Sequence, residues 1–304
     1  MHLDPKDFVC ETCIKSKSHR TTYYSSQNKC KNPFDLIHTD VWGPSSIISK
    51  SGCRWYVSFI DDCSRMTWLY LLKTKDEVSK VIQDFHKLVK TQFGKEIKTI
   101  RSDNGTEYLN QRVQIFFREN EIIHETTCVG TPQQNGIAER KNRHLLEMTR
   151  SLLLENKVPP MFWDNALSFA VYLSNRTPTS ANDYKTPIQV LSSHVTIPSV
   201  LNLPPKIFGC VAYIHIQKPF RTKLEPRAEK CVFLGMGANQ KGYKCYNPGT
   251  RKFYTTMDVT FLENESFFHK TQDLIQEGSS HDEPDFDLTF LSDPLVADLG
   301  PGPS

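Results

Sequence analysis

The chain has 304 residues, of which 38% are hydrophobic and 11% aromatic, enough apolar mass for two compact units. No stretch of about 18 apolar residues exists, which excludes a membrane-spanning helix. The first residues show no basic patch followed by an apolar run, so we expect no secretory signal. The nine cysteines are odd in number and favour a reducing compartment over a disulfide scaffold.

The formal net charge of +3 conceals an uneven distribution. Residues 271–304 carry eight acids and no Lys or Arg, so residues 1–270 hold 37 basic against 26 acidic side chains, a net charge of +11. A body this basic attracts polyanions, because the phosphates that it neutralises release their counterions. Nucleic acid is therefore a favoured partner, and a basic protein without such a partner is the alternative.

The residues from 34 to 176 predict an α/β domain. Strands rich in branched and aromatic residues are expected at 36–41, 55–60, 66–72, 97–100 and 122–126. Apolar residues at helical spacing predict helices at 78–89, 113–120, 137–154 and 161–175. The short link at 61–65 makes the second and third strands an antiparallel hairpin. This order of strands and helices predicts a mixed sheet flanked by helices, as expected of an RNase-H-like core.

The remaining segments predict smaller units. Residues 1–33 have the pattern of a small metal module or its remnant, followed by a linker, and residues 177–205 form a Pro-rich linker. Short strands separated by turn residues predict a small β-barrel over 206–268. The acidic tail, 269–304, is expected to be disordered.

Three carboxylates are placed where a metal-dependent phosphodiester chemistry needs them. Asp40 ends the first strand, Asp103 follows the fourth, and Glu139 lies on the first turn of the helix at 137–154. If the first and fourth strands are neighbours, Asp40 and Asp103 emerge side by side at one sheet edge. Mg²⁺ prefers oxygen ligands, and two or three carboxylates from different elements suffice to hold it. Spacing alone leaves ordinary surface acids as the alternative, because the chain has 34 acids.

The residues around these acids resemble a known family. The segments His-Thr-Asp-Val-Trp-Gly-Pro at 38–44, Arg-Ser-Asp-Asn-Gly at 101–105 and Thr-Pro-Gln-Gln-Asn-Gly-Ile-Ala-Glu-Arg-Lys-Asn-Arg at 131–143 are similar to those of the integrase region of copia-type (Ty1/copia) LTR retrotransposon Pol polyproteins. These belong to the retroviral integrase superfamily, whose DD(35)E centre has the same 35-residue gap. Residues 223–235 resemble the family's SH3-like carboxyl-terminal module, and the resemblance covers about residues 8–268.

The resemblance implies an enzyme that trims the 3′ ends of element DNA and joins them to target DNA. It implies that Asp40, Asp103 and Glu139 bind two Mg²⁺ or Mn²⁺ ions, that DNA is the partner, and that the chain forms a homo-oligomer. No organic cofactor and no membrane partner are expected. The resemblance also implies work in the nucleus; without it, the cytoplasm is the expected location.

Polar and basic residues beside Glu139 are candidate DNA contacts. Arg140, Lys141 and Arg143 could hold phosphates, which positions DNA without specifying its sequence. Alternatively they form a solvated helix face, with Arg143 paired to Glu147 four residues on. Further candidates from a loop beside the site are Gln133, Gln134 and Asn135, for which ordinary loop polarity is the alternative.

The amino-terminal cysteines resemble half of the family's HHCC zinc domain. Cys10 and Cys13 supply two ligands, whereas structural zinc needs four. The paired histidines should lie upstream, yet only His2 is there. Zn²⁺ binding is therefore possible but the site is incomplete, and residues 1–33 are interpreted as a truncated remnant.

Other acids and other functions stay as alternatives. Asp61 and Asp62 are expected to serve the hairpin turn, because Asp caps its own backbone, and Glu107 is expected at the surface. A domesticated or inactive DNA-binding fragment of such a polyprotein would explain the missing histidines. An RNase-H-like nuclease that cuts without joining is the third possibility.

Overall fold

The structure is a computed structural model, and the residues it describes are 15, 29–128, 132–198, 203–238 and 240–268. The predicted zinc ligands Cys10 and Cys13 and the acidic tail lie outside the described residues. No helix within the described ranges is both long and apolar enough to cross a membrane.

The first half of the chain forms a five-stranded mixed sheet of order β3-β2-β1-β4-β5. Its strands are β1 (Leu36–Trp42), β2 (Trp55–Asp61), β3 (Thr67–Leu72), β4 (Thr99–Ser102) and β5 (Ile123–Thr126). β1, β2 and β3 pair antiparallel, whereas β4 and β5 run parallel to β1. The predicted hairpin and the predicted mixed sheet are both confirmed.

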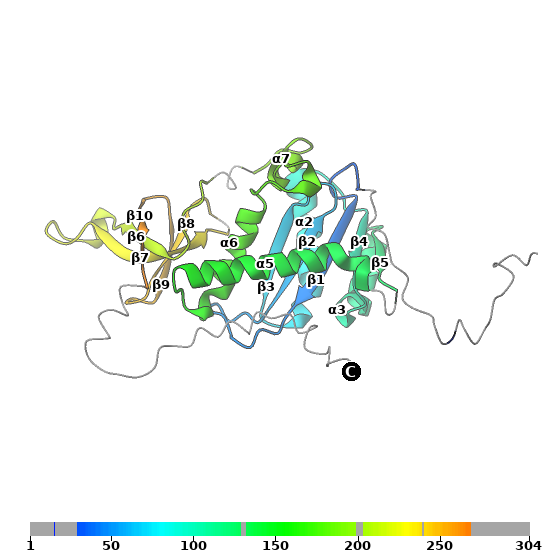
Figure 1. Cartoon of the computed structure of the whole chain (residues 1–304), viewed down its shortest axis with the longest axis horizontal. Coiled ribbons are helices and arrows are strands. Elements are labelled where there is room, and N and C mark those ends of the chain that lie inside the picture. Colours follow the sequence, from blue (N-terminus) through cyan, green and yellow to red (C-terminus); the bar gives the residue numbers. More distant parts are fainter. Residues whose placement is uncertain (1–14, 16–28, 129–131, 199–202, 239, 269–304) are drawn as a thin grey trace, which may run out of the picture.

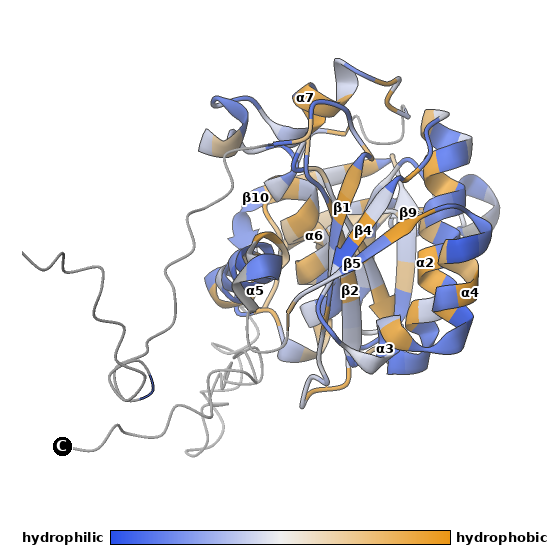
Figure 2. Cartoon of the chain, turned by 90° about the vertical axis from the view of Figure 1, so that its right-hand side faces the viewer, coloured by the Kyte–Doolittle hydropathy of each residue, from blue (hydrophilic) through white to orange (hydrophobic). Residues whose placement is uncertain are grey.

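Helices cover both faces of this sheet (Figure 1). They are α2 (Val78–Leu88), α3 (Thr106–Leu109), α4 (Gln111–Glu119), α5 (Gly136–Glu155) and α6 (Trp163–Ser174). α2 and α4 pack their apolar stripes on one face, against Val57 and Phe59 of β2, and Figure 2 shows their polar sides turned outward. α5 and α6 pack on the other face, against Tyr56 of the same strand. Successive strand residues point to opposite faces, which explains this division.

Two segments for which the sequence predicts a loop or a linker contain helical turns. The predicted polar loop before α5 includes a 3₁₀-helix, η4 (Pro132–Asn135). The predicted Pro-rich linker contains the 3₁₀-helix η6 (Ser180–Asn182) and α7 (Pro187–Ser192), which begins with a Thr186 capping box and a proline at its first position. Leu191 of α7 is fully buried in the core beneath α2, so this stretch is part of the domain rather than a free linker.

The second unit is an antiparallel five-stranded sheet of order β10-β6-β7-β8-β9. Its strands are β6 (Cys210–His215), β7 (Ala228–Met236), β8 (Tyr243–Asn247), β9 (Lys252–Thr256) and β10 (Val259–Ser266). This architecture agrees with the predicted SH3-like barrel, and β10 is a strand that the sequence pattern did not indicate.

The two units share one hydrophobic core. Phe169 of α6 stacks on Phe208, with ring centroids 5.7 Å apart, and meets Phe233 of β7 edge-on at 5.5 Å. All three rings are almost completely buried. The second sheet is therefore fixed against α6, which crosses the same face of the first sheet as α5.

Candidate active site

The strand register brings Asp40 and Asp103 to the same level. β1 and β4 are parallel neighbours in which Leu36 pairs with Thr99 and His38 with Arg101. Continuing this register by two residues places Asp40 opposite Asp103, the first residue after β4. The carboxyl ends of neighbouring parallel strands meet at one sheet edge, which is where the sequence analysis expected the pair.

Asp40 faces α5 and is held by two donors. The Asn142 side chain donates from Nδ2 to Asp40 Oδ2 at 2.9 Å, and the backbone N–H of Val41 donates to Oδ1 at 2.9 Å. Ser58 of β2 donates its hydroxyl to Asn142 Oδ1, also at 2.9 Å. Because its oxygen is engaged by Ser58, the Asn142 amide must present its NH₂ group to Asp40.

The largest influences on the Asp40 carboxylate are its burial, two neighbouring acids and two hydrogen bonds. Burial is the largest cause that raises its pKa to about 7, and the charges of Asp103 and, to a smaller extent, Glu139 contribute to that rise. The hydrogen bonds from Asn142 and Val41 act in the opposite direction. The negative charges of Asp103 and Glu139 therefore both act on Asp40, and a bound cation would reduce this repulsion.

Asp103 sits in a tight turn beside the partly exposed ion pair of Lys75 and Glu107. Its Oδ1 accepts from the backbone N–H of Gly105 at 3.0 Å. A Cβ at Gly105 would lie 2.7 Å from the Glu107 carboxylate, so only glycine fits there without displacement. Burial raises the pKa of Asp103, and the charge of Glu107 adds to that rise, while Lys75 lowers it.

The expectation that Glu107 is a surface residue is wrong. Its side chain is only 6% exposed, and Lys75 Nζ lies 3.0 Å from its Oε2 in an ion pair without hydrogen-bond geometry. Glu107 lies in α3, four residues after Asp103, and its charge acts on that carboxylate. The prediction for Asp61 is confirmed: it accepts from the N–H and hydroxyl of Ser64, at 2.7 and 2.6 Å, within the hairpin.

Glu139 approaches the two aspartates but does not complete a ready-made ligand shell. It lies in the first turn of α5, one turn before Asn142, and its charge acts on Asp40. Across the described residues, no three or more His, Cys, Asp or Glu side chains converge closely enough to hold a metal ion. The chemistry of these side chains nevertheless suits hard divalent cations, which prefer oxygen ligands. Asp40 and Asp103 are carboxylates that repel each other and have raised pKa values.

The predicted DNA contacts fall into different environments. Arg143 is exposed and follows Glu139 by four residues, on the same side of α5. No carboxylate of the described chain lies within ion-pair distance of Arg143, so the alternative pairing with Glu147 is not formed. Lys141 instead turns away from the carboxylates and donates to Ser174 Oγ at 3.0 Å.

The loop residues before α5 are also more constrained than expected. Asn135 is 1% exposed and donates from Nδ2 to the Thr39 carbonyl at 3.1 Å, bridging η4 to β1. Gln134 is exposed and accepts from the backbone N–H of Cys128 at 2.6 Å. Gln133 belongs to η4, and its side chain lies outside the description. DNA binding by these residues stays a prediction.

Sequence reasoning missed Asn142 and Ser58. The signal was present for Asn142, because a polar residue three positions after Glu139 lies on the same side of a helix. Ser58 gives no such signal. Its role depends on the register that pairs it with Asp40 across β1 and β2.

Comparison with known proteins identifies both units. Residues 31–132 match the integrase core domain family, and residues 210–275 match the retroviral polymerase SH3-like domain family. The chain is 41% identical over 256 residues to the retrovirus-related Pol polyprotein from transposon TNT 1-94 of Nicotiana tabacum, covering 84% of this chain and 19% of that protein. It is 36% identical over 297 residues to the polyprotein from transposon RE2 of Arabidopsis thaliana, covering 96% and 20%. The chain thus spans about a fifth of the length of these relatives.

Two solved retroviral structures are also similar. One is a chain of a simian T-cell lymphotropic virus intasome in complex with the PP2A regulatory subunit B56 gamma, with 20% identity, a TM-score of 0.49 and coverage of 83% of this chain and 87% of that one. The other is the HTLV-2 integrase catalytic core domain in complex with magnesium, with 22% identity, a TM-score of 0.39 and coverage of 52% and 97%. The chain itself joins an integrase core domain to a retroviral polymerase SH3-like domain, and it belongs with the copia-type Pol polyproteins of plant transposons.

Proposed function

We propose that the chain is a metal-dependent integrase that trims the 3′ ends of element DNA and joins them to target DNA. The observation that carries this proposal is the alignment of Asp40 with Asp103 on adjacent parallel strands, with the charge of Glu139 acting on Asp40. Asp40 and Asp103 would hold Mg²⁺ or Mn²⁺ from the sheet, and Glu139 would complete the site from α5. When bound, such ions lower the pKa of the attacking hydroxyl and stabilise the leaving oxygen.

The protein's own groups prepare this site. Because the pKa of Asp40 is raised to about 7, a cation competes there with a proton and releases it on binding. Asn142 and Ser58 fix the orientation of the Asp40 carboxylate before any ion arrives. The Gly105 N–H fixes Asp103 in the same way. The three carboxylates would have to draw closer together to share an ion, because they do not form a ready metal site among the described residues.

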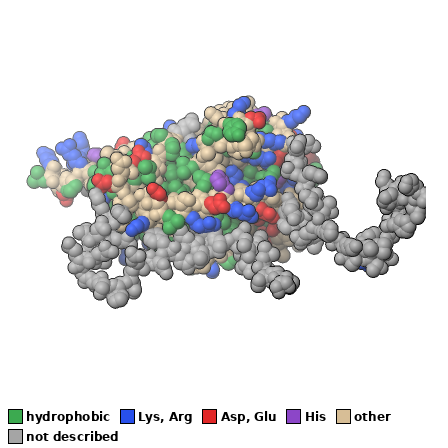
Figure 3. Space-filling view, viewed as in Figure 1, with side chains coloured by type: hydrophobic (Ala, Val, Ile, Leu, Met, Phe, Trp, Pro, Cys, Tyr) green, Lys and Arg blue, Asp and Glu red, His purple; other side chains and the backbone are tan. Residues whose placement is uncertain are grey.

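DNA is the partner that the proposal requires. Arg143 is exposed beside Glu139 and can hold a phosphate of the strand being processed. Further basic residues follow one another in and around the loop between β6 and β7, at the protruding end of the second sheet (Figure 3): Lys218, Arg221, Lys223, Arg227 and Lys230. Joining two element ends at one target requires both ends together, so the proposal includes a homo-oligomer acting in the nucleus.

The test is a strand-joining assay with the full chain, Mn²⁺ and labelled duplex ends. The wild-type protein should give shortened ends and joined products, and Asp103→Asn should abolish both. Asp84→Asn is the matched control, because it makes the same change at an exposed acid of α2 on the other face of the sheet. Control activity should equal that of the wild type.

The other outcomes distinguish the alternative functions. Cleavage without joined products would assign a nuclease, and DNA binding without either reaction would assign an inactive DNA-binding fragment. Equal activity in Asp103→Asn and wild type would contradict the proposed site.

A further inference from the structure

The two sides of α5 carry different chemistry. With 3.6 residues per turn, successive helical residues are about 100° apart, so Lys141 lies roughly 200° around the axis from Glu139. Ile137, Arg140 and His144 lie on the Lys141 side. Glu139 and Asn142 lie on the side that serves Asp40. Arg140 and Lys141, which directly follow Glu139 in the sequence, therefore lie on the side of α5 that faces away from Asp40.

A pocket of about 520 Å³ opens on the Lys141 side. α5 forms one wall, and the last residue of α6 and the chain after it contribute the hydroxyls of Ser174, Thr177, Thr179 and Ser180. Ile60 of β2 and Arg65 of the following hairpin turn also line the pocket. On the face that α5 crosses, Figure 3 shows Lys and Arg side chains next to a histidine.

The cations of this pocket are incompletely neutralised. Arg65 is paired, with its Nη1 2.7 Å from Asp62 Oδ1. Neither Lys141 nor Arg140 forms an ion pair with a carboxylate in the part of the chain that the structure describes. The Lys141 side chain is half-buried, and its ammonium group donates to Ser174 Oγ at 3.0 Å. A half-buried ammonium group beside two guanidinium groups creates a strong demand for an anion.

The composition of the walls indicates which anion fits. Guanidinium and ammonium groups with hydroxyl donors match the several oxygens of a phosphate. The remaining lining is apolar, with Ile60, Ile137, Pro178 and Pro187 available to an organic group. A volume of this size lies within the roughly 300–1,000 Å³ of small-molecule sites.

We infer that this pocket binds the phosphate of a nucleotide unit, with Lys141 and Arg140 as its principal cations, on the side of α5 opposite the carboxylates. The unit comes either from a free nucleotide or from a nucleic-acid strand that passes behind the active site. The phosphate chemistry is the same for both sources. The inference concerns binding alone and holds whether or not the chain joins DNA.

The test separates this pocket from the carboxylate site. The full chain carrying Asp103→Asn, in EDTA, is titrated calorimetrically with inorganic pyrophosphate and then with adenosine monophosphate. Binding should be measurable, and adding Arg140→Gln or Lys141→Met should weaken it about tenfold or more, as expected for loss of a charge-assisted hydrogen bond. Arg118→Gln is the matched control, because it makes the same change at an exposed arginine of α4, on the other face of the sheet, and it should leave both affinities unchanged.

Competition then identifies the source. If a short DNA duplex displaces pyrophosphate, the natural ligand is a strand; if the duplex does not compete, it is a free nucleotide. No binding of either probe, or equal binding in the Arg140→Gln variant, would overturn the inference. Arg140 is exposed, so this variant keeps the fold even if Lys141→Met does not.

Discussion

At the scale of single residues, Asn142 links the helix that carries Glu139 to the strand that carries Asp40. Its two amide atoms have different partners, the Ser58 hydroxyl and the Asp40 carboxylate. This network fixes one orientation of the carboxylate and lowers its pKa slightly against the effect of burial. Asn142 is therefore a positioning residue for Asp40.

Removing that amide should reduce activity while leaving the fold intact. We expect Asn142→Ala to lower the rate of strand joining about 10- to 100-fold, the usual effect of losing a partner that orients a metal ligand. Ser58→Ala removes only the group that orients the amide and should cost less. Wild-type rates in Asn142→Ala, measured in the joining assay at saturating Mn²⁺, would show that Asp40 needs no such support.

The raised pKa of Asp40 gives the metal-free protein a distinctive pH dependence. The folded-state pKa is about 7 against a reference value of 3.8, so between these values the folded state holds more protons than the unfolded state. The free energy of unfolding should therefore fall as pH rises from about 4 to about 7. Burial likewise raises the pKa of Asp103, so its titration should also lower the free energy of unfolding as pH rises.

Urea unfolding in EDTA across this pH range measures the effect. Asp40→Asn should flatten the fall, because asparagine does not titrate. Asp84→Asn, which changes an exposed acid, should retain it. Identical pH profiles for wild type and Asp40→Asn would mean that Asp40 ionises normally in the folded protein.

At the scale of elements, the turn after β4 depends on a contact that is distant in sequence. Lys75, just before α2, pairs with Glu107 of α3, whose charge in turn acts on Asp103. The Lys75 side chain is 41% exposed, so solvent screens the pair. The pair fixes α3 under the Asp103 turn rather than contributing a large stability.

Glu107→Gln should therefore have a modest effect on stability and a specific effect on Asp103. We expect a loss of about 1 kcal/mol in the free energy of unfolding, as for a screened ion pair. The pKa of Asp103 should fall, because a neighbouring negative charge is gone. Carboxyl titration by NMR measures the pKa, and Glu119→Gln on exposed α4 is the control. An unchanged Asp103 pKa would contradict the assigned influence of Glu107.

Local patterns predicted most elements of the first domain, and the failures have physical causes. Alternation and helical spacing located β1, β2, β3, α2 and α5, since each buries one face. α7 was missed although Thr186, Pro187 and Gln189 form a helix-start signal, because the surrounding prolines indicated a linker. The burial of Glu107 could not be predicted, since Lys75 lies 32 positions away in sequence.

The candidate site shows the same division. The positions of Asp40 and Asp103 at the ends of two strands predicted that they are neighbours. This prediction needed only that the two strands lie side by side and in parallel, which β1 and β4 do. Lys141 was grouped with Arg140 and Arg143 as a DNA contact beside Glu139, although helical geometry places it on the opposite side of α5. The pocket wall around Ser174 comes from the end of α6 and the chain after it, which no local pattern connects to the Lys141 side of α5.

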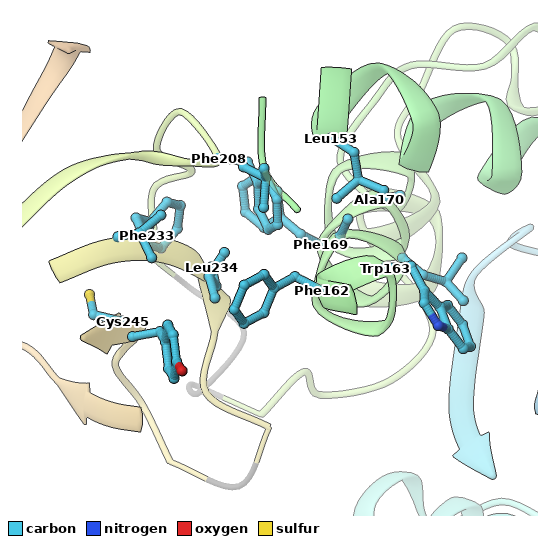
Figure 4. Close-up of a cluster of buried hydrophobic side chains, with 14 of the residues drawn as sticks. Leu153, Phe162, Trp163, Phe169, Ala170, Phe208, Phe233, Leu234 and Cys245 are labelled. Carbon is cyan, nitrogen blue, oxygen red and sulfur yellow. The ribbon is translucent and has the colours of Figure 1, made fainter. Parts of the chain in front are cut away.

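At the scale of the whole molecule, the integrase core and the SH3-like unit are built as one body. Figure 4 shows Leu153, Phe162 and Phe169 from the α5–α6 side meeting Phe208 and Phe233 from the second unit. Gly235 of β7 lies against Phe169 with φ of +111°, a backbone conformation that residues with a side chain rarely adopt. A basic loop on the second unit is therefore held at a fixed position relative to the carboxylates.

The shared core predicts cooperative unfolding of both units. Scanning calorimetry of the full chain should show a single transition, and Phe169→Ala should cost about 3–5 kcal/mol, as for large aromatic truncations in cores. Phe116→Ala, at a half-buried ring of α4 away from the second unit, should cost less. Two well-separated transitions in the wild type would show that the units are independent.

The most direct measurement is a crystal structure of the full chain grown with Mn²⁺, with anomalous diffraction to locate the ions. We expect anomalous peaks beside Asp40 and Asp103, with Glu139 as the third residue that would hold the ions. Asp103→Asn crystals should lose at least one peak. At saturating Mn²⁺, the proposed metal site would be contradicted if no peak lay beside Asp40, or if a peak lay there while Glu139 pointed away from it.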